Sequence, residues 1–158
     1  MGPATTLSGG RAEIRPLQFS DLGDLLTLYA HLHRHDDPLP GCDGIQAVWQ
    51  EILANPSHRI FGLFVSEALI ASCAITIIKN LTRGCRPYGV IENVVTHASH
   101  RRNGYGKAIL AHALDTAWGA GCYKVMLLTG KKDEATARFY ESAGFDGDEK
   151  RGFVAKMP

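Results

Sequence analysis

The spacing of hydrophobic residues divides the first third of the chain into one strand and two helices. The segment 12–18, AEIRPLQ, predicts a short strand. Over residues 21–33 apolar side chains recur every three or four positions after a capping Ser20, which predicts an amphipathic helix. The same spacing predicts a second helix over 43–54, with Trp49 on its apolar face, ended by Asn55 and Pro56.

The middle of the chain carries three apolar runs typical of strands. Segments 58–66 and 68–79 predict a hairpin that turns at Glu67, and residues 88–97 predict a third strand. A helix follows over 104–118, with Trp118 on its core face, and the run 123–129 is apolar enough for a strand buried on both faces.

The last predicted elements are a short helix over 133–144, ending at Gly144, and a strand over 151–157 that closes the sheet. The predicted order is therefore β-α-α-β-β-β-α-β-α-β, an α+β domain over residues 12–158. Residues 1–11 are small and polar and predict a flexible leader.

Composition narrows the possible partners. The formal net charge is +1 over 158 residues, so neither nucleic acid nor a membrane surface is expected as the main partner. Four cysteines without CxxC pairing favour a reducing compartment, and no apolar run has transmembrane length, which together predict a cytoplasmic protein. The histidine-rich run 31–37 lacks the pattern of a metal site, and no metal is expected.

The segment 101–107, RRNGYGK, lies between a predicted strand and a predicted helix. The first amides of a helix lack intrahelical partners and carry a partial positive charge, so such a turn binds anions. Gly104 and Gly106 leave room for phosphate oxygens near those amides, and Arg101, Arg102 and Lys107 add charge. The spacing matches neither a Walker loop nor a dinucleotide fingerprint. A plain basic surface turn is the alternative.

The wider segment VVTHASHRRNGYG resembles the acetyl-CoA signature of the GCN5-related N-acetyltransferase (GNAT) family, which Arg101, Gly104 and Gly106 satisfy. Some thirty residues later, ARFYESAGF resembles the second signature of the family. The element order is similar to that of the family over residues 13–156. The resemblance implies a mixed, mostly antiparallel, twisted sheet flanked by helices, and acetyl-CoA as co-substrate.

The resemblance also implies where acetyl-CoA binds. Its diphosphate would lie on the amides of the Gly-rich turn, and its pantetheine arm would pair with the backbone of the strand before it. That strand would splay from the next one to admit the thioester. Relatives often hold this arm with an asparagine, where this chain has Asp133 and Thr136, so Thr136 is the candidate and Asp133 a helix cap. The implied contacts are Val94, Val95, Thr96, Arg101, Arg102, Asn103, Gly104, Tyr105, Gly106, Lys107 and Thr136.

Two residues are candidates for proton transfer. Tyr140 matches the general-acid tyrosine of the family, and a phenol with a pKa of about 10 is protonated at neutral pH. Glu92 lies in the apolar run VIENVV and matches an acidic residue that draws the amine proton; a carboxylate paired with arginine is the alternative. Asn93, Glu92, His33 and Arg34 are the candidate substrate contacts.

The segments GCYKVML, IENVV and RFYESAGF resemble the glucosamine-6-phosphate N-acetyltransferase branch of the family. An amino-sugar phosphate is therefore one expected acceptor, with basic residues for its phosphate at Arg83, Arg86, Lys131 and Lys132. Another small amine or a peptide amine stays open as acceptor. A catalytically silent acyl-CoA sensor and a nucleotide-binding protein are alternatives of a different class, and a homodimer is expected by analogy.

Overall fold

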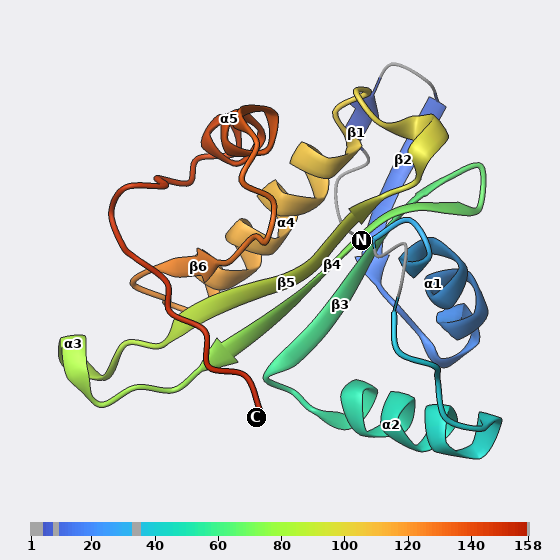
Figure 1. The fold of residues 1–158 in the computed structure, drawn as a ribbon, viewed down its shortest axis with the longest axis horizontal. Coiled ribbons are helices and arrows are strands. Elements are labelled where there is room, and N and C mark those ends of the chain that lie inside the picture. The colour runs from blue at the N-terminus through green and yellow to red at the C-terminus, as the bar shows by residue number, and fades with distance from the viewer. Residues whose placement is uncertain (1–4, 8–9, 33–35, 158) are drawn as a thin grey trace.

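The computed structural model describes residues 5–7, 10–32 and 36–157. In this part of the chain six strands form one sheet in chain order, with every neighbouring pair antiparallel except the parallel pair β5–β6 (Figure 1). The hairpin predicted at Glu67 joins β3 to β4. The strands are β1 (Thr5–Leu7), β2 (Gly10–Pro16), β3 (His58–Val65), β4 (Ala68–Ile78), β5 (Tyr88–Thr96) and β6 (Val125–Leu127).

The helices cover both faces of the sheet. Helices α1 and α2 pack on one face, and α4 and α5 lie on the other (Figure 1). The α+β class predicted from the sequence is confirmed, with a mixed and mostly antiparallel sheet. The helices are α1 (Leu22–Tyr29), α2 (Cys42–Ala54), α3 (Thr82–Cys85), α4 (Tyr105–Gly119) and α5 (Glu134–Ser142), with 3-10 turns at Phe19–Asp21 and Ala98–His100.

Each face of the sheet has its own hydrophobic core. Between the sheet and α4, the buried residues of the helix follow the predicted spacing of three or four, because they form one stripe toward β4 and β5. Trp49 anchors the other core between α2 and the sheet, and its indole Nε1 donates to the Phe19 carbonyl at 3.2 Å. The buried α4 stripe comprises Tyr105, Gly106, Ile109, Leu110, Ala113 and Ala117.

Trp118 is not a core residue, contrary to the prediction. Its side chain is 49% exposed, whereas Ala117 is fully buried. Consecutive positions on a helix lie about 100° apart, so Trp118 falls beside the buried stripe. An apolar residue at the edge of such a stripe does not have to be covered.

The segment 151–157 forms no strand, and the predicted sixth-strand closure is wrong. Phe153 and Val154 are 87% and 73% exposed, and the segment pairs with no strand of the described sheet. For the same reason β6 is an edge strand of only three half-buried residues rather than a strand buried on both faces. Leu128, just beyond it, is 58% exposed.

The predicted leader is also not fully irregular. Residues Thr5–Leu7 form β1, which pairs antiparallel with residues 10–12 of β2. Strand pairing uses backbone groups and tolerates a segment with few apolar side chains, especially one with β-branched threonines. Composition alone therefore missed this strand.

Candidate active site

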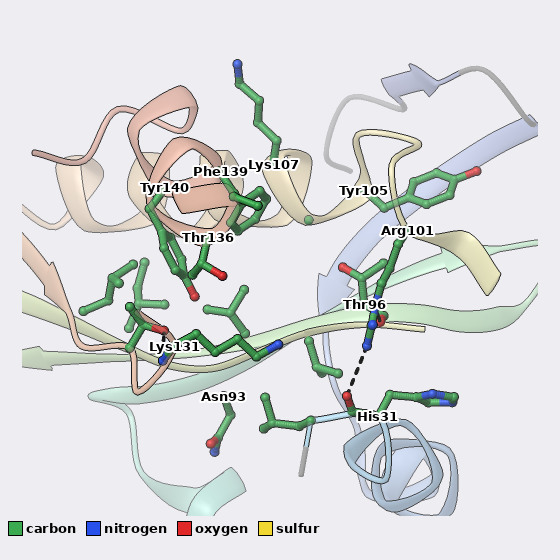
Figure 2. A pocket seen from close by; sticks show the side chains of 18 of the residues that line it. His31, Asn93, Thr96, Arg101, Tyr105, Lys107, Lys131, Thr136, Phe139 and Tyr140 are labelled. Carbon is green, nitrogen blue, oxygen red and sulfur yellow. Dashed lines mark hydrogen bonds between the residues drawn. The ribbon is translucent and has the colours of Figure 1, made fainter. Parts of the chain in front are cut away.

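The site begins where β5 and β6 part. The two strands pair only at Gly89, Val90 and Ile91, so the edge of β5 is unpaired from Glu92 to Thr96. A cavity of about 870 Å³ lies along this open edge, beneath α5 (Figure 2). The splayed strands expected from the sequence are therefore present.

The opposite edge of the same segment carries a bulge. Val95 pairs with Ser72 and Glu92 with Ala74, which leaves Asn93 and Val94 opposite a single residue of β4. Asn93 adopts the left-handed conformation, with φ of +52°, which asparagine tolerates better than most residues. The bulge turns this part of β5 relative to the paired half of the strand.

The cavity brings most of the predicted site residues together. Asn103 is not among the residues that line it, and its side chain instead donates to the His100 carbonyl at 3.3 Å. His33 and Arg34 lie outside the described residues. The predicted residues that do line the cavity are Glu92, Asn93, Val94, Val95, Thr96, Arg101, Arg102, Gly104, Tyr105, Gly106, Lys107, Thr136 and Tyr140.

Glycine is required at the two positions of the turn for different structural reasons. Gly104 is the N-cap of α4 with φ of +82°, and open space surrounds the position that a Cβ would occupy. Gly106 is buried, and a Cβ there would meet Phe139 at 3.1 Å and the Thr96 hydroxyl at 3.2 Å. Gly104 thus leaves the helix N-terminus accessible. Gly106 instead allows α4 to pack closely against α5 and β5, a role that the sequence interpretation did not foresee.

The basic residues of the turn are not equivalent. Arg101 donates to the Thr96 carbonyl and to the His31 carbonyl, both at 3.2 Å, and so ties the end of α1 to the end of β5 (Figure 2). Lys107 extends away from β5 in the same view. The Tyr105 side chain is a core residue at 4% exposure, so a ligand in the cavity would meet its backbone rather than its phenol.

Helix α5 presents Thr136 and Tyr140 to the cavity (Figure 2). Asp133 is the N-cap of this helix, because its carboxylate accepts from the Thr136 amide at 2.8 Å and from the Thr136 hydroxyl at 3.0 Å. The cap assigned to Asp133 from the sequence is confirmed. Burial, together with the charge of Glu92, raises the pKa of Tyr140, so the phenol is protonated at neutral pH.

Glu92 is exposed to the cavity and forms no ion pair within the described ranges. Its place on the open edge removes the burial cost that the apolar sequence context suggested, and the arginine-paired alternative is not observed.

Behind the bulge, burial raises the pKa of Tyr29 to about 12. Its buried hydroxyl makes no hydrogen bond of good geometry among the described residues, although the nearby Asn93 side chain partly offsets the rise in pKa.

The sequence analysis did not predict several of the residues that line the cavity, because these residues lie in loops and turns outside the recognised motifs. Thr129 and Gly130 come from the loop after β6, and His31 comes from the turn after α1. Of the basic residues considered for an acceptor phosphate, Lys131 lines this cavity, whereas Arg83 and Arg86 line a separate hollow. Local periodicity carries no signal for contacts between segments that are distant in the sequence, such as those that form this cavity.

The His31 ring contacts the His97 ring at a tilt of 55°, with centroids 4.2 Å apart.

Across residues 5–7, 10–32 and 36–157, no three His, Cys, Asp or Glu side chains are grouped to hold a metal ion. No helix in those ranges is long and apolar enough to cross a membrane. The cytoplasmic location and the homodimer stay predictions.

The class of protein follows from the comparison with protein families. The model of the Acetyltransferase (GNAT) family matches residues 25–145. The chain belongs to this family and is a GNAT N-acetyltransferase. Enzymes of this family use acetyl-CoA.

Individual relatives show which members of the family this chain is similar to. Glucosamine 6-phosphate N-acetyltransferase of Trypanosoma brucei brucei is 32% identical over 139 residues, which cover 88% of this chain and 92% of that protein. A putative acetyltransferase from Agrobacterium tumefaciens has a solved structure with a TM-score of 0.86 and 43% identity, covering 92% and 99% of the two chains. Glucosamine-6-phosphate N-acetyltransferase from Arabidopsis thaliana has a TM-score of 0.77 and 25% identity, covering 92% and 97%.

Proposed function

We propose that this enzyme transfers the acetyl group of acetyl-CoA directly to the primary amine of a small amino-sugar phosphate, with glucosamine 6-phosphate as the first candidate. The observation that carries the proposal is the open edge of β5 between Glu92 and Thr96, which runs from the N-terminus of α4 to the hydroxyl-bearing face of α5. The likeness to glucosamine 6-phosphate N-acetyltransferases supports the choice of acceptor.

The residues of the open edge fit a pantetheine arm. The Thr96 carbonyl accepts from Arg101 rather than from β4, while the next amide, of His97, donates to the Ile70 carbonyl of β4 at 2.8 Å. Backbone groups alternate sides along a strand, so the Thr96 amide, and in the proposal the backbone groups of Val94, face the cavity. An extended chain with amides can add to such an edge as a strand would. Val95 faces β4 instead, so of the predicted trio we assign the pantetheine contacts to Val94 and Thr96.

The N-terminus of α4 fits a diphosphate. Its first amides have no intrahelical partner, and Gly104 leaves the approach to them open. Arg102 lines the same end of the cavity and adds positive charge. Bound acetyl-CoA would supply the thioester that carries the acetyl group. In the proposal Arg101 acts mainly by positioning, because two of its donors already hold backbone carbonyls.

In the proposal, two residues of the chain accept and donate the protons of the reaction. Glu92 is solvent-accessible in the cavity and accepts the proton that the amine loses, directly or through water. Tyr140 holds a proton at its phenol oxygen and delivers it to the departing thiolate. The raised pKa of Tyr140 suits that role, because the phenol is protonated across the neutral range. Lys131, in the same cavity, is the candidate partner for an acceptor phosphate.

The test follows release of free thiol from acetyl-CoA with glucosamine 6-phosphate, glucosamine, amino acids, polyamines and short peptides as acceptors. We expect release with glucosamine 6-phosphate, weaker release with glucosamine, and a selective increase in the KM for the phosphorylated sugar in Lys131→Ala. Lys132→Ala is the matched control, since Lys132 does not line the cavity. Release with a peptide and not with either sugar would show that the acceptor is wrong.

A further inference from the structure

A second hollow, of about 450 Å³, lies away from the active site. Its lining comes from α3, from the residues before β6 and from the segment after α5: Arg83, Arg86, Tyr123, Lys124, Glu149 and Lys150. Arg86 lies two residues before the start of β5, whereas the acetyl-CoA cavity follows the other half of that strand. Figure 1 shows α3 at the end of the sheet remote from the start of α4.

The charge of this hollow is out of proportion to that of the chain. Four of its six lining residues are cationic and one, Glu149, is a carboxylate, although the whole chain has a formal net charge of only +1. Among the described residues the ion pairs are Arg15–Asp21 and Arg138–Glu134, so no cation of the hollow is neutralised by one. Like charges held close together repel, and a bound anion relieves that repulsion.

Arg86 is held by the turn that follows helix α4. Its Nε donates to the Gly121 carbonyl at 3.4 Å and its Nη2 to the Cys122 carbonyl at 3.2 Å. These contacts hold the guanidinium without cancelling its charge, and they leave other N–H groups for a ligand. The side chain is therefore placed before any ligand arrives.

Two further cations rest on aromatic rings. The Arg83 guanidinium carbon is 5.8 Å from the centre of the Tyr123 ring, and the Lys124 ammonium is 5.6 Å from the centres of the Tyr123 and Tyr88 rings. Cation–π contacts orient these side chains while leaving their donors free. Arg83 also has φ of +55°, a conformation that a residue with a side chain rarely adopts. A preordered set of cations loses less conformational entropy when an anion binds.

We propose that this hollow binds a small phosphate-bearing anion at a site separate from that of acetyl-CoA. Arginine forks and lysine ammonium groups together match the oxygens of phosphate groups, and the volume fits a phosphorylated small molecule. Because Glu149 and Lys150 belong to the segment after α5, the bound anion also joins that segment to α3 and to the start of β6. The proposal does not depend on the identity of the amine acceptor.

The experiment uses inorganic diphosphate as the probe and the full chain saturated with coenzyme A, which occupies the other anion site. We expect calorimetry in about 0.15 M salt to show one additional site. Arg83→Glu should weaken it at least tenfold, and Glu149→Gln should strengthen it, because the only carboxylate of the hollow is removed. Arg59→Glu, an exposed arginine of β3 outside the hollow, should leave it unchanged.

A second measurement reports the link to the segment after α5. Lys150 and Arg151 are exposed trypsin sites, and diphosphate should slow cleavage there in the wild type but not in Arg83→Glu. If Arg83→Glu does not fold, Lys124→Gln serves in its place. Absence of the additional site, or equal weakening in Arg59→Glu, would overturn the proposal. So would an increase in the KM for the amine acceptor in Arg83→Glu, since the hollow would then belong to the acceptor site.

Discussion

The two halves of β5 belong to one strand but have different roles, and only the second half contains the bulge at Asn93 and Val94. From Gly89 to Ile91 the strand has β4 on one side and β6 on the other, and Ile91 is fully buried. From Glu92 to Thr96 it has β4 alone, and Glu92 is exposed. The change occurs between two adjacent residues. Loss of one neighbouring strand is therefore enough to convert a structural strand into the wall of a binding site.

The physical reason lies in the backbone. Every peptide group needs a hydrogen-bond partner, and an unpaired strand edge leaves a row of them to water or to a ligand. In most proteins such an edge is a hazard that has to be covered. Here α5 covers the opening from above without pairing with it, so the edge of β5 from Glu92 to Thr96 lines a cavity.

The largest expected effect comes from the paired half. Ile91→Ala should lower the free energy of unfolding by about 2–5 kcal/mol, because it leaves a cavity in the core between the sheet and α4. Denaturant unfolding measures this loss. Glu92→Gln, one position further on, is the control and should change the unfolding free energy by less than about 0.5 kcal/mol. Equal losses in both variants would contradict the division of β5 into two halves.

The next effect concerns the chemistry above the open half. Tyr140→Phe should lower kcat at least about tenfold with little change in the KM for acetyl-CoA, because it removes only a proton donor. Burial and Glu92 raise the pKa of Tyr140 above its usual value of about 10. The ratio of wild-type to variant rates should thus stay constant from neutral pH to about pH 9 and shrink only at still higher pH. A ratio that shrinks near pH 8 would rule out Tyr140 as the donor.

Glu92→Gln should have a smaller effect on turnover, of about tenfold near neutral pH. A base is needed only while the acceptor amine is protonated, so the deficit should diminish as pH rises and more of the amine is neutral. Steady-state rates at saturating acetyl-CoA across this range provide the test. A deficit independent of pH would indicate that Glu92 orients the acceptor rather than accepts its proton.

The smallest effect is expected at the cap of α5. The hydrogen bonds from Thr136 hold the pKa of Asp133 below its usual value of about 3.9. Because the folded-state pKa is the lower one, the stabilisation is complete above the unfolded-state pKa of about 3.9. It disappears as pH falls through the folded-state pKa. The difference in unfolding free energy between wild type and Asp133→Ala should therefore be constant at neutral pH and decrease below about pH 4. An undiminished difference in acid would exclude the charged cap.

Local sequence patterns predicted most of the elements correctly. The hydrophobic spacing located α1, α2 and α4, the segment ending at Gly144 located α5, and the β-branched runs located β3, β4 and β5. The short-range cap at Asp133 was predictable as well, because its partner Thr136 is three residues away. The failures share a feature: β1, the exposure of Trp118 and the irregular segment 151–157 each depend on which distant segment lies alongside.

The candidate site divides in the same way. Arg101, Gly104 and Tyr140 were visible as motif positions, and the cavity contains all three. The packing reason for Gly106 was not visible, because it depends on Phe139 and Thr96, which are distant in the sequence. The tie from Arg101 to the His31 carbonyl joins residues 70 positions apart, which no local pattern encodes.

By itself the sequence determined the family, the order of most elements and the chemical groups available for acetyl transfer, since each is recorded in short-range patterns of residue type. Only the tertiary structure decided where β6 leaves β5, and that Lys131 lines the cavity beside β5 while Arg83 and Arg86 line a hollow elsewhere. These outcomes depend on strand pairing and packing between distant segments, and such contacts are settled only when the whole chain folds.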